Sequence, residues 1–89
     1  MPVYLAIAAT KPKEFEALLK SKIPSHDVYQ VDNQTWLISQ SSSIVTPKEL
    51  SDFLGVSSGT CGRIFITILG AYYGYHGKDV WDWLSSKGA

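Results

Sequence analysis

The stretch that decides the fold runs from residue 63 to residue 84 and reads RIFITILGAYYGYHGKDVWDWL. It begins with β-branched and apolar residues, which are typical of a strand. A segment of glycines and tyrosines follows, and the end has the apolar spacing of a short amphipathic helix. More than half of the chain's Phe, Tyr and Trp residues lie here. Because so much apolar surface is costly to leave in water, we expect this stretch to be packed.

At the other end of the chain, residues 2–9 read PVYLAIAA and predict a strand. Both alternating sets of side chains are apolar, so this strand is expected at the centre of a sheet. Thr10 is placed to cap a helix at about 11–21, whose apolar residues recur at helical spacing. The Ile23-Pro24 pair ends that helix, since the residue before proline is pushed out of the α region.

Between these ends the pattern predicts a hairpin and a second helix. Residues 27–40 contain two β runs around a polar Asp32-Asn33 turn. The sequence TPKEL at 46–50 supplies an N-cap, a proline at the first helical position and a capping-box glutamate. Gly55 is well placed to end this helix. Its expected buried stripe consists of Leu50, Phe53 and Leu54.

The resulting element order is β-α-β-β-α-β over a single domain, residues 1–89, with a tail and short helix at 70–89. A chain of 89 residues buries enough surface for one core only. The order predicts an α+β, ferredoxin-like βαββαβ fold. It has a four-stranded antiparallel sheet, two helices on one face and an aromatic C-terminal tail.

In that arrangement the strand at 63–69 lies at an edge of the sheet, although it is apolar on both faces. Ile64, Ile66 and Ile68 point to one side and Phe65 and Leu69 to the other. An unprotected apolar edge invites pairing with another chain. Either the tail folds back over the open face of the sheet, or a second protomer covers it.

The composition narrows the classes of partner. Eight basic and eight acidic side chains give a net charge of zero, so no overall field attracts the chain to nucleic acid or to anionic membranes. No apolar run is long enough to span a bilayer. Cys61, the single cysteine, cannot form an internal disulfide, and the N-terminal residues lack the pattern of a signal peptide. A cytoplasmic location is the expectation.

The candidate binding residues lie in and beside the tail. Tyr72, Tyr73 and Tyr75 could form a stacking platform for single-stranded nucleic acid, with Arg63 and Lys78 holding phosphates. A tail packed on the sheet explains the same aromatic residues without any ligand.

Chemistry at single residues is less well supported. His76 could be a general base or a stacking partner, or a loop histidine without such a role. Asp79 and Asp82 could bind a metal, but acidic residues in a first helical turn also favour the helix dipole. A small molecule bound between the tail and the sheet would have only Tyr75, His76 and Arg63 as polar candidates to bind it. We expect no catalytic residues, no metal and no cofactor.

Four segments carry a resemblance to a known family. They are PVYLAIAAT, TWLIS, TPKEL, and IFITILG with the glycine-tyrosine segment and WDWL after it. In these the chain resembles the small ferredoxin-fold proteins related to the CRISPR-associated spacer-acquisition subunit. The resemblance implies dimerisation through the sheet. It also implies that a nuclease would carry a metal-binding aspartate at the end of the first strand, where this chain has Ala9, and alanine cannot bind a hard cation.

Two functions follow as hypotheses. The first is a small non-enzymatic interaction protein that binds a macromolecule, as a homodimer or with a protein partner that the sequence does not name. The alternative is a nucleic-acid-binding relative of the spacer-acquisition subunit, with weak or no metal-dependent nuclease activity.

Overall fold

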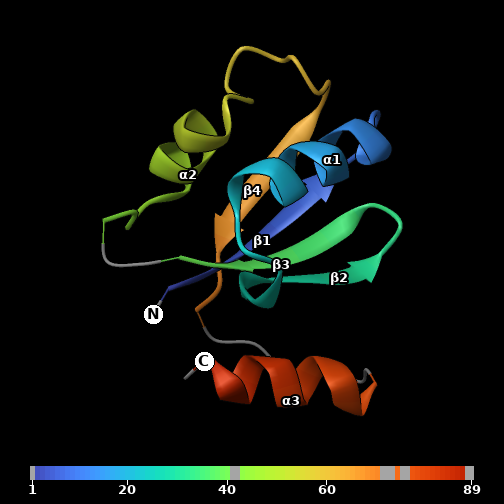
Figure 1. The fold of residues 1–89 in the computed structure, drawn as a ribbon, viewed down its shortest axis with the longest axis vertical. Coiled ribbons are helices and arrows are strands. Elements are labelled where there is room, and N and C mark those ends of the chain that lie inside the picture. Colours follow the sequence, from blue (N-terminus) through green and yellow to red (C-terminus); the bar gives the residue numbers. More distant parts are fainter. Residues whose placement is uncertain (1, 41–42, 71–73, 75–76, 88–89) are drawn as a thin grey trace.

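The computed structural model describes residues 2–40, 43–70, 74 and 77–87. Within them, a four-stranded antiparallel sheet is combined with three α-helices (Figure 1). The strands are β1 (Val3–Ala8), β2 (Val28–Asp32), β3 (Thr35–Ser39) and β4 (Ile64–Ile68). The helices are α1 (Pro12–Lys22), α2 (Pro47–Leu54) and α3 (Lys78–Ser86), and a 3₁₀ turn, η1 (Ser25–Asp27), precedes β2.

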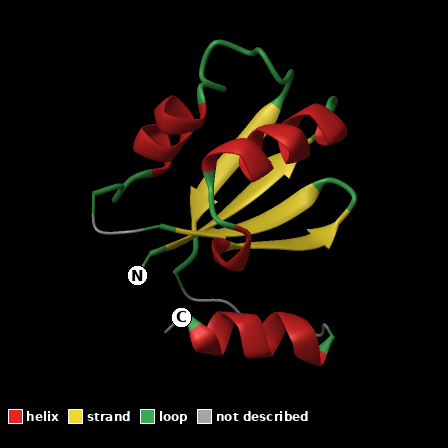
Figure 2. Cartoon of the chain, viewed as in Figure 1, coloured by secondary structure: helices red, strands yellow, loops and turns green. Residues whose placement is uncertain are grey.

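The strands follow one another across the sheet in the order β2-β3-β1-β4 (Figure 2). β1 pairs with β3 on one side and with β4 on the other, both antiparallel. Its predicted central position is therefore confirmed, and β4 lies at an edge as expected. The predicted hairpin is also present, but its turn is Asn33-Gln34, one residue later than the predicted Asp32-Asn33, because Asp32 still pairs with Thr35.

α1 and α2 pack on the same face of the sheet. On this face β1 presents Tyr4, Ala6 and Ala8, whose small or flat side chains let the helices approach closely. Phe15 of α1 meets Trp36 of β3 edge to face, with ring centroids 5.3 Å apart. The buried core on this face comprises Tyr4, Ala6, Ala8, Phe15, Leu19, Ile23, Trp36, Ile38, Leu50, Leu54, Val56 and Cys61.

α3 packs on the opposite face of the same sheet. Val80 and Leu84, one helical turn apart, are buried against Val3 and Leu37. The ring of Trp83 lies 6.0 Å from that of Tyr29 on β2, measured between centroids. The last part of the predicted tail is thus a helix that folds back on its own sheet. The tyrosine-rich part, residues 71–73 and 75–76, lies outside the described residues.

The start and end signals of α2 are confirmed. The Oγ1 of Thr46 accepts a hydrogen bond of 3.1 Å from the Glu49 N–H. The Glu49 carboxylate in turn accepts from the Val45 N–H and the Thr46 hydroxyl. Gly55 ends the helix with a φ of 77°, in the left-handed region that glycine enters at low cost.

Two local predictions are wrong. Thr10 does not cap α1, because the helix begins at Pro12 and its N-cap position falls on Lys11. The Thr10 hydroxyl instead accepts a 2.9 Å hydrogen bond from the Arg63 N–H. Phe53 is not part of the buried stripe, since it is 46% exposed. Leu50 and Leu54 define the inner face of a helix only about two turns long, and Phe53 lies to its side.

Replacing Leu84 by alanine tests the docking of α3. Leu84 is 3% exposed, and truncating a buried leucine costs about 2–5 kcal/mol of unfolding free energy. Chemical denaturation should therefore show a much lower midpoint. The exposed neighbour Ser85 supplies the control, because Ser85→Ala should change stability by less than about 0.5 kcal/mol. Equal midpoints for the two variants would show that α3 does not stabilise the sheet.

Candidate interaction site

The free edge of β4 is the most distinctive surface of the described chain. The Leu69 N–H donates to Val3 O at 2.8 Å, and the Ala9 N–H donates to Arg63 O at 2.9 Å. Because backbone groups alternate in direction along a strand, the odd-numbered residues of β4 bond to β1. The even-numbered residues point their N–H and C=O groups away from the sheet, and no strand among the described residues pairs with them. These residues are Ile64, Ile66 and Ile68.

Large apolar side chains flank this edge on both faces. Phe65 is 66% exposed and Ile68 is 45% exposed. Phe65 pairs with Ile7 of β1, which is 38% exposed. α3 covers Val3, Leu37 and their neighbours, whereas neither Ile7 nor Phe65 belongs to that packed cluster. The C-terminal helix therefore leaves an apolar strip uncovered beside the free edge.

The opposite edge of the sheet is protected. β2 carries Gln30 and Asp32, both exposed. Its register shifts between them, and the Gln30 amide donates to Asp32 O. Polar side chains and an irregular register are devices that prevent a strand from pairing with another chain. β4 reads IFITI and has no charged residue. The two edges of one sheet thus differ in their readiness to pair.

A groove of about 540 Å³ runs beside β4 on the helix side, between that strand, α2 and the loop that joins them. Its apolar lining includes Val56, Ile64 and Ile66, and its polar lining includes Lys48 and Arg63. The Arg63 side chain is exposed and forms no ion pair with any residue that the structure describes.

Charges at the rim of this groove are partly paired. Lys48 Nζ lies 2.9 Å from Asp52 Oδ2, and the Ser57 hydroxyl donates to Asp52 Oδ1 at 2.6 Å. The hydrogen bond from Ser57, with that from Lys48, holds the pKa of the Asp52 carboxyl below its usual value. The same Asp52 contact raises the pKa of Lys48. Both groups therefore stay charged at neutral pH.

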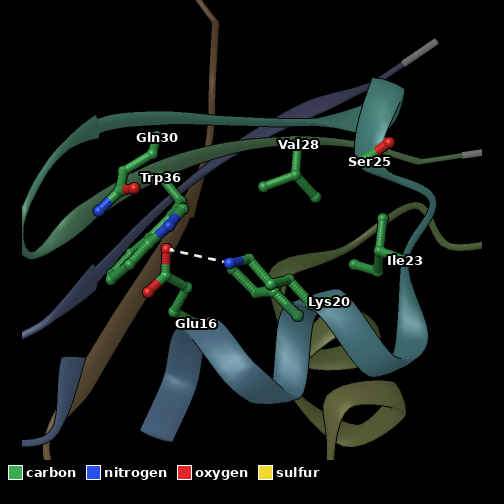
Figure 3. A pocket seen from close by; sticks show the side chains of 8 residues that line it. Glu16, Lys20, Ile23, Ser25, Val28, Gln30 and Trp36 are labelled. Atoms are coloured by element: carbon green, nitrogen blue, oxygen red, sulfur yellow. Dashed lines mark ion pairs between the residues drawn. The ribbon is translucent and has the colours of Figure 1, made fainter. Parts of the chain in front are cut away.

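A second cavity, of about 380 Å³, lies between α1 and the β2–β3 hairpin (Figure 3). Trp36, Leu19, Ile23 and Val28 line its apolar part. At its mouth Lys20 Nζ lies 3.7 Å from Glu16 Oε2, and the Lys20 side chain is 76% exposed. The cavity could hold a small apolar group. Its polar groups lie at the mouth rather than inside, so it lacks the buried donors and acceptors that make a pocket specific.

The residues singled out from the sequence are dispersed. Arg63 directly precedes β4, and the start of that strand lies away from α3 (Figure 1). Lys78 begins α3 and forms an ion pair of 3.0 Å with Asp82, so these two cations do not converge on one phosphate site. Tyr72, Tyr73, Tyr75 and His76 lie outside the described residues.

Cys61 is buried, 7% exposed, in the loop before β4. The described part of the chain contains no group of three or more His, Cys, Asp or Glu residues that could hold a metal ion. Among the same residues, no helix has the length and apolar character needed to cross a membrane.

Sequence reasoning missed the contribution of Lys48, because this residue, in the first turn of α2, meets the groove only through the packing of α2 beside β4. Comparison with known proteins adds no assignment. No protein-family model matches the chain, and no curated protein matches its sequence significantly.

Gly62 holds the corner at which Arg63 enters β4. Its φ is 77°, and a Cβ at this position would clash with Thr10 Oγ1, the acceptor of the Arg63 N–H. Gly59 has a φ of 85° but open space around it. Gly59→Ala should cost about 1–2 kcal/mol through its backbone alone. Gly62→Ala should destabilise the protein further, because the new Cβ would disturb the hydrogen bond between the Arg63 N–H and Thr10. This bond contributes roughly 0.5–1.5 kcal/mol.

Thermal and chemical denaturation of both variants measures this difference. Thr10→Ala in the Gly62→Ala background should recover part of the loss, since it removes the clashing hydroxyl. Equal destabilisation by the two glycine substitutions would contradict the role assigned to the Thr10 contact.

Proposed function

We propose that the protein is a small non-enzymatic interaction module that acts by binding another macromolecule and that forms a homodimer. The observation that carries this proposal is the β4 edge, where backbone groups that no strand of the described residues pairs lie next to Phe65, 66% exposed. Burying one phenylalanine contributes about 1.5–3 kcal/mol, so this surface favours association. The buried thiol of Cys61 is compatible with the expected cytoplasmic location.

The fold that we propose is the ferredoxin-like βαββαβ arrangement, with α3 as an addition to it. The order of the strands, read as β4-β1-β3-β2, supports this assignment. The packing of α1 and α2 on one face of the sheet supports it as well. Because a fold of this kind carries many unrelated functions, the proposed activity depends on the edge and not on the fold.

A charge at the edge tests the proposal. Phe65→Lys should weaken self-association at least about tenfold, which corresponds to 1.4 kcal/mol, because lysine at an edge opposes strand pairing. Gln30→Lys on the protected β2 edge is the matched control and should leave association unchanged. Sedimentation velocity over a concentration series measures both.

Denaturation of the same variants shows whether they remain folded. Phe65 is mostly exposed, so both substitutions should change stability by less than about 0.5 kcal/mol. A wild-type protein that stays monomeric throughout the series, or a Phe65→Lys variant that associates like wild type, would contradict the proposal.

A second candidate function, nucleic-acid binding by a relative of the spacer-acquisition subunit, has one supporting observation. Arg63 and Lys48 line the same groove, and Lys48 is paired there with Asp52. These two cations near one surface could neutralise one or two phosphates. Ala9 at the end of β1, in place of the aspartate that the resemblance requires, supports binding without metal-dependent cleavage.

If the protein binds nucleic acid there, the binding should be weak and salt-sensitive. Each neutralised phosphate contributes about −0.9 to the log–log salt slope on duplex DNA, so a slope shallower than about −5 is expected. Arg63→Ala should reduce that slope by about 1, whereas Lys20→Ala on α1 should not. No cleavage of DNA or RNA should occur with magnesium or manganese. Cleavage that a single substitution abolishes would overturn the non-enzymatic assignment.

A further inference from the structure

We propose that the partner at β4 is a second copy of this chain, paired antiparallel about a two-fold axis at Ile66, so that one continuous sheet runs through both subunits. This inference rests on the proposed function and specifies its contact.

The direction of the backbone groups limits the possible registers. Only Ile64, Ile66 and Ile68 present N–H and C=O groups to a partner, because the odd-numbered residues bond to β1. In an antiparallel pair of β4 strands, each of these even-numbered residues must therefore lie opposite an even-numbered residue of the other strand. A two-fold axis gives both subunits the same contact and closes the assembly at a dimer.

Among the registers that remain, one places every residue of β4 opposite a residue of β4 in the partner subunit. With the axis at Ile66, Ile64 lies opposite Ile68 of the partner subunit, and Phe65 lies opposite Thr67 of the partner subunit. A shift of the axis to Phe65 places Ile68 opposite a loop glycine, Gly62. A shift to Thr67 places Ile64 opposite another, Gly70. Both shifted registers leave one isoleucine of β4 opposite a loop glycine and reduce the isoleucine–isoleucine pairs from three to two, and each such pair contributes roughly 0.2–1 kcal/mol.

The groove beside β4 supplies space for the paired side chains. Side chains of Ile64, Ile66 and Ile68 share the helix face of the sheet, since they pair in register with Ala8, Ala6 and Tyr4. In the dimer the same side chains of the second copy extend from the next strand on this face. Ile64 and Ile66 line the groove of about 540 Å³ under α2, together with Val56 and with the polar residues Lys48 and Arg63. The isoleucines of the second copy would extend the apolar part of this lining.

The charge pattern is also compatible with a second copy. No charged residue lies within β4, so no like charges are brought opposite each other by the two-fold axis. Arg63, just before the strand, lies opposite Leu69 of the partner subunit and keeps its guanidinium at the exposed end of the contact. A contact of one short strand is smaller than a standard interface of about 1,600 Å². The dimer should therefore dissociate on dilution.

Cysteine cross-linking distinguishes the registers. In the proposed dimer Phe65 and Thr67 of the partner subunit form a non-hydrogen-bonded pair, with Cα atoms about 4.5 Å apart, a separation that a disulfide can span. Phe65→Cys and Thr67→Cys chains, each in a Cys61→Ala background, are mixed and oxidised. We expect the disulfide-linked heterodimer as the main product, identified by mass spectrometry, and little linkage in either variant alone.

Each other outcome has a definite meaning. If the Phe65→Cys variant cross-links by itself, the axis lies at Phe65, and if the Thr67→Cys variant does so, the axis lies at Thr67. Either result contradicts the proposed register but still shows a dimer paired through β4. Ser85→Cys on the exposed side of α3 measures linkage by random collision. A dimer by sedimentation without linkage above that level would place the contact away from β4. A monomer at all concentrations would overturn both the register and the proposed function.

Discussion

The pairing of β1 on both of its sides is the interaction on which the rest of the structure depends. β1 joins the β2–β3 hairpin to β4, so the sheet exists only through it. Its side chains also alternate between the two faces of the sheet, so they contribute to the packing on both. Tyr4, Ala6 and Ala8 lie in the core under α1 and α2, whereas Val3 packs under α3. Apolar residues are therefore expected at most positions of this strand, since one face is covered by α1 and α2 and the other is covered by α3 at Val3.

The two layers cover the sheet unequally, and the candidate site is a result of that difference. α1 and α2 together cover the face of the sheet on which Ile38 of β3 and Ala8 of β1 are buried. α3 is a single helix that packs over Val3, Leu37 and part of β2. One helix is about 10 Å wide, which is roughly two strands, so it cannot cover four. Ile7 and Phe65 lie beyond its reach and remain exposed.

The start of β4 is fixed where two segments of the chain meet, one directly after β1 and one directly before β4. The Thr10 hydroxyl, at the end of β1, accepts from the Arg63 N–H, and Gly62 leaves room for it. This contact joins the two chain segments that flank the β1–β4 ladder. It also fixes where β4 begins, and hence which backbone groups point to solvent. The geometry of the edge thus depends on Thr10, whose hydroxyl binds the Arg63 N–H and does not cap α1.

Much of this architecture was determined by the sequence itself. Alternation predicted the strands, capping residues predicted α2 and its end at Gly55, and the uncharged IFITI run predicted an exposed apolar edge. These signals act over a few residues, so they can be read locally. Tertiary structure alone decided that Thr10 bonds to Arg63, that Phe53 lies outside the core and that Lys48 joins Arg63 at a groove. It also decided that α3 docks on its own sheet and stops short of Phe65. Each of these contacts joins residues far apart in the chain, and their meeting depends on how the helices pack, which no local pattern records.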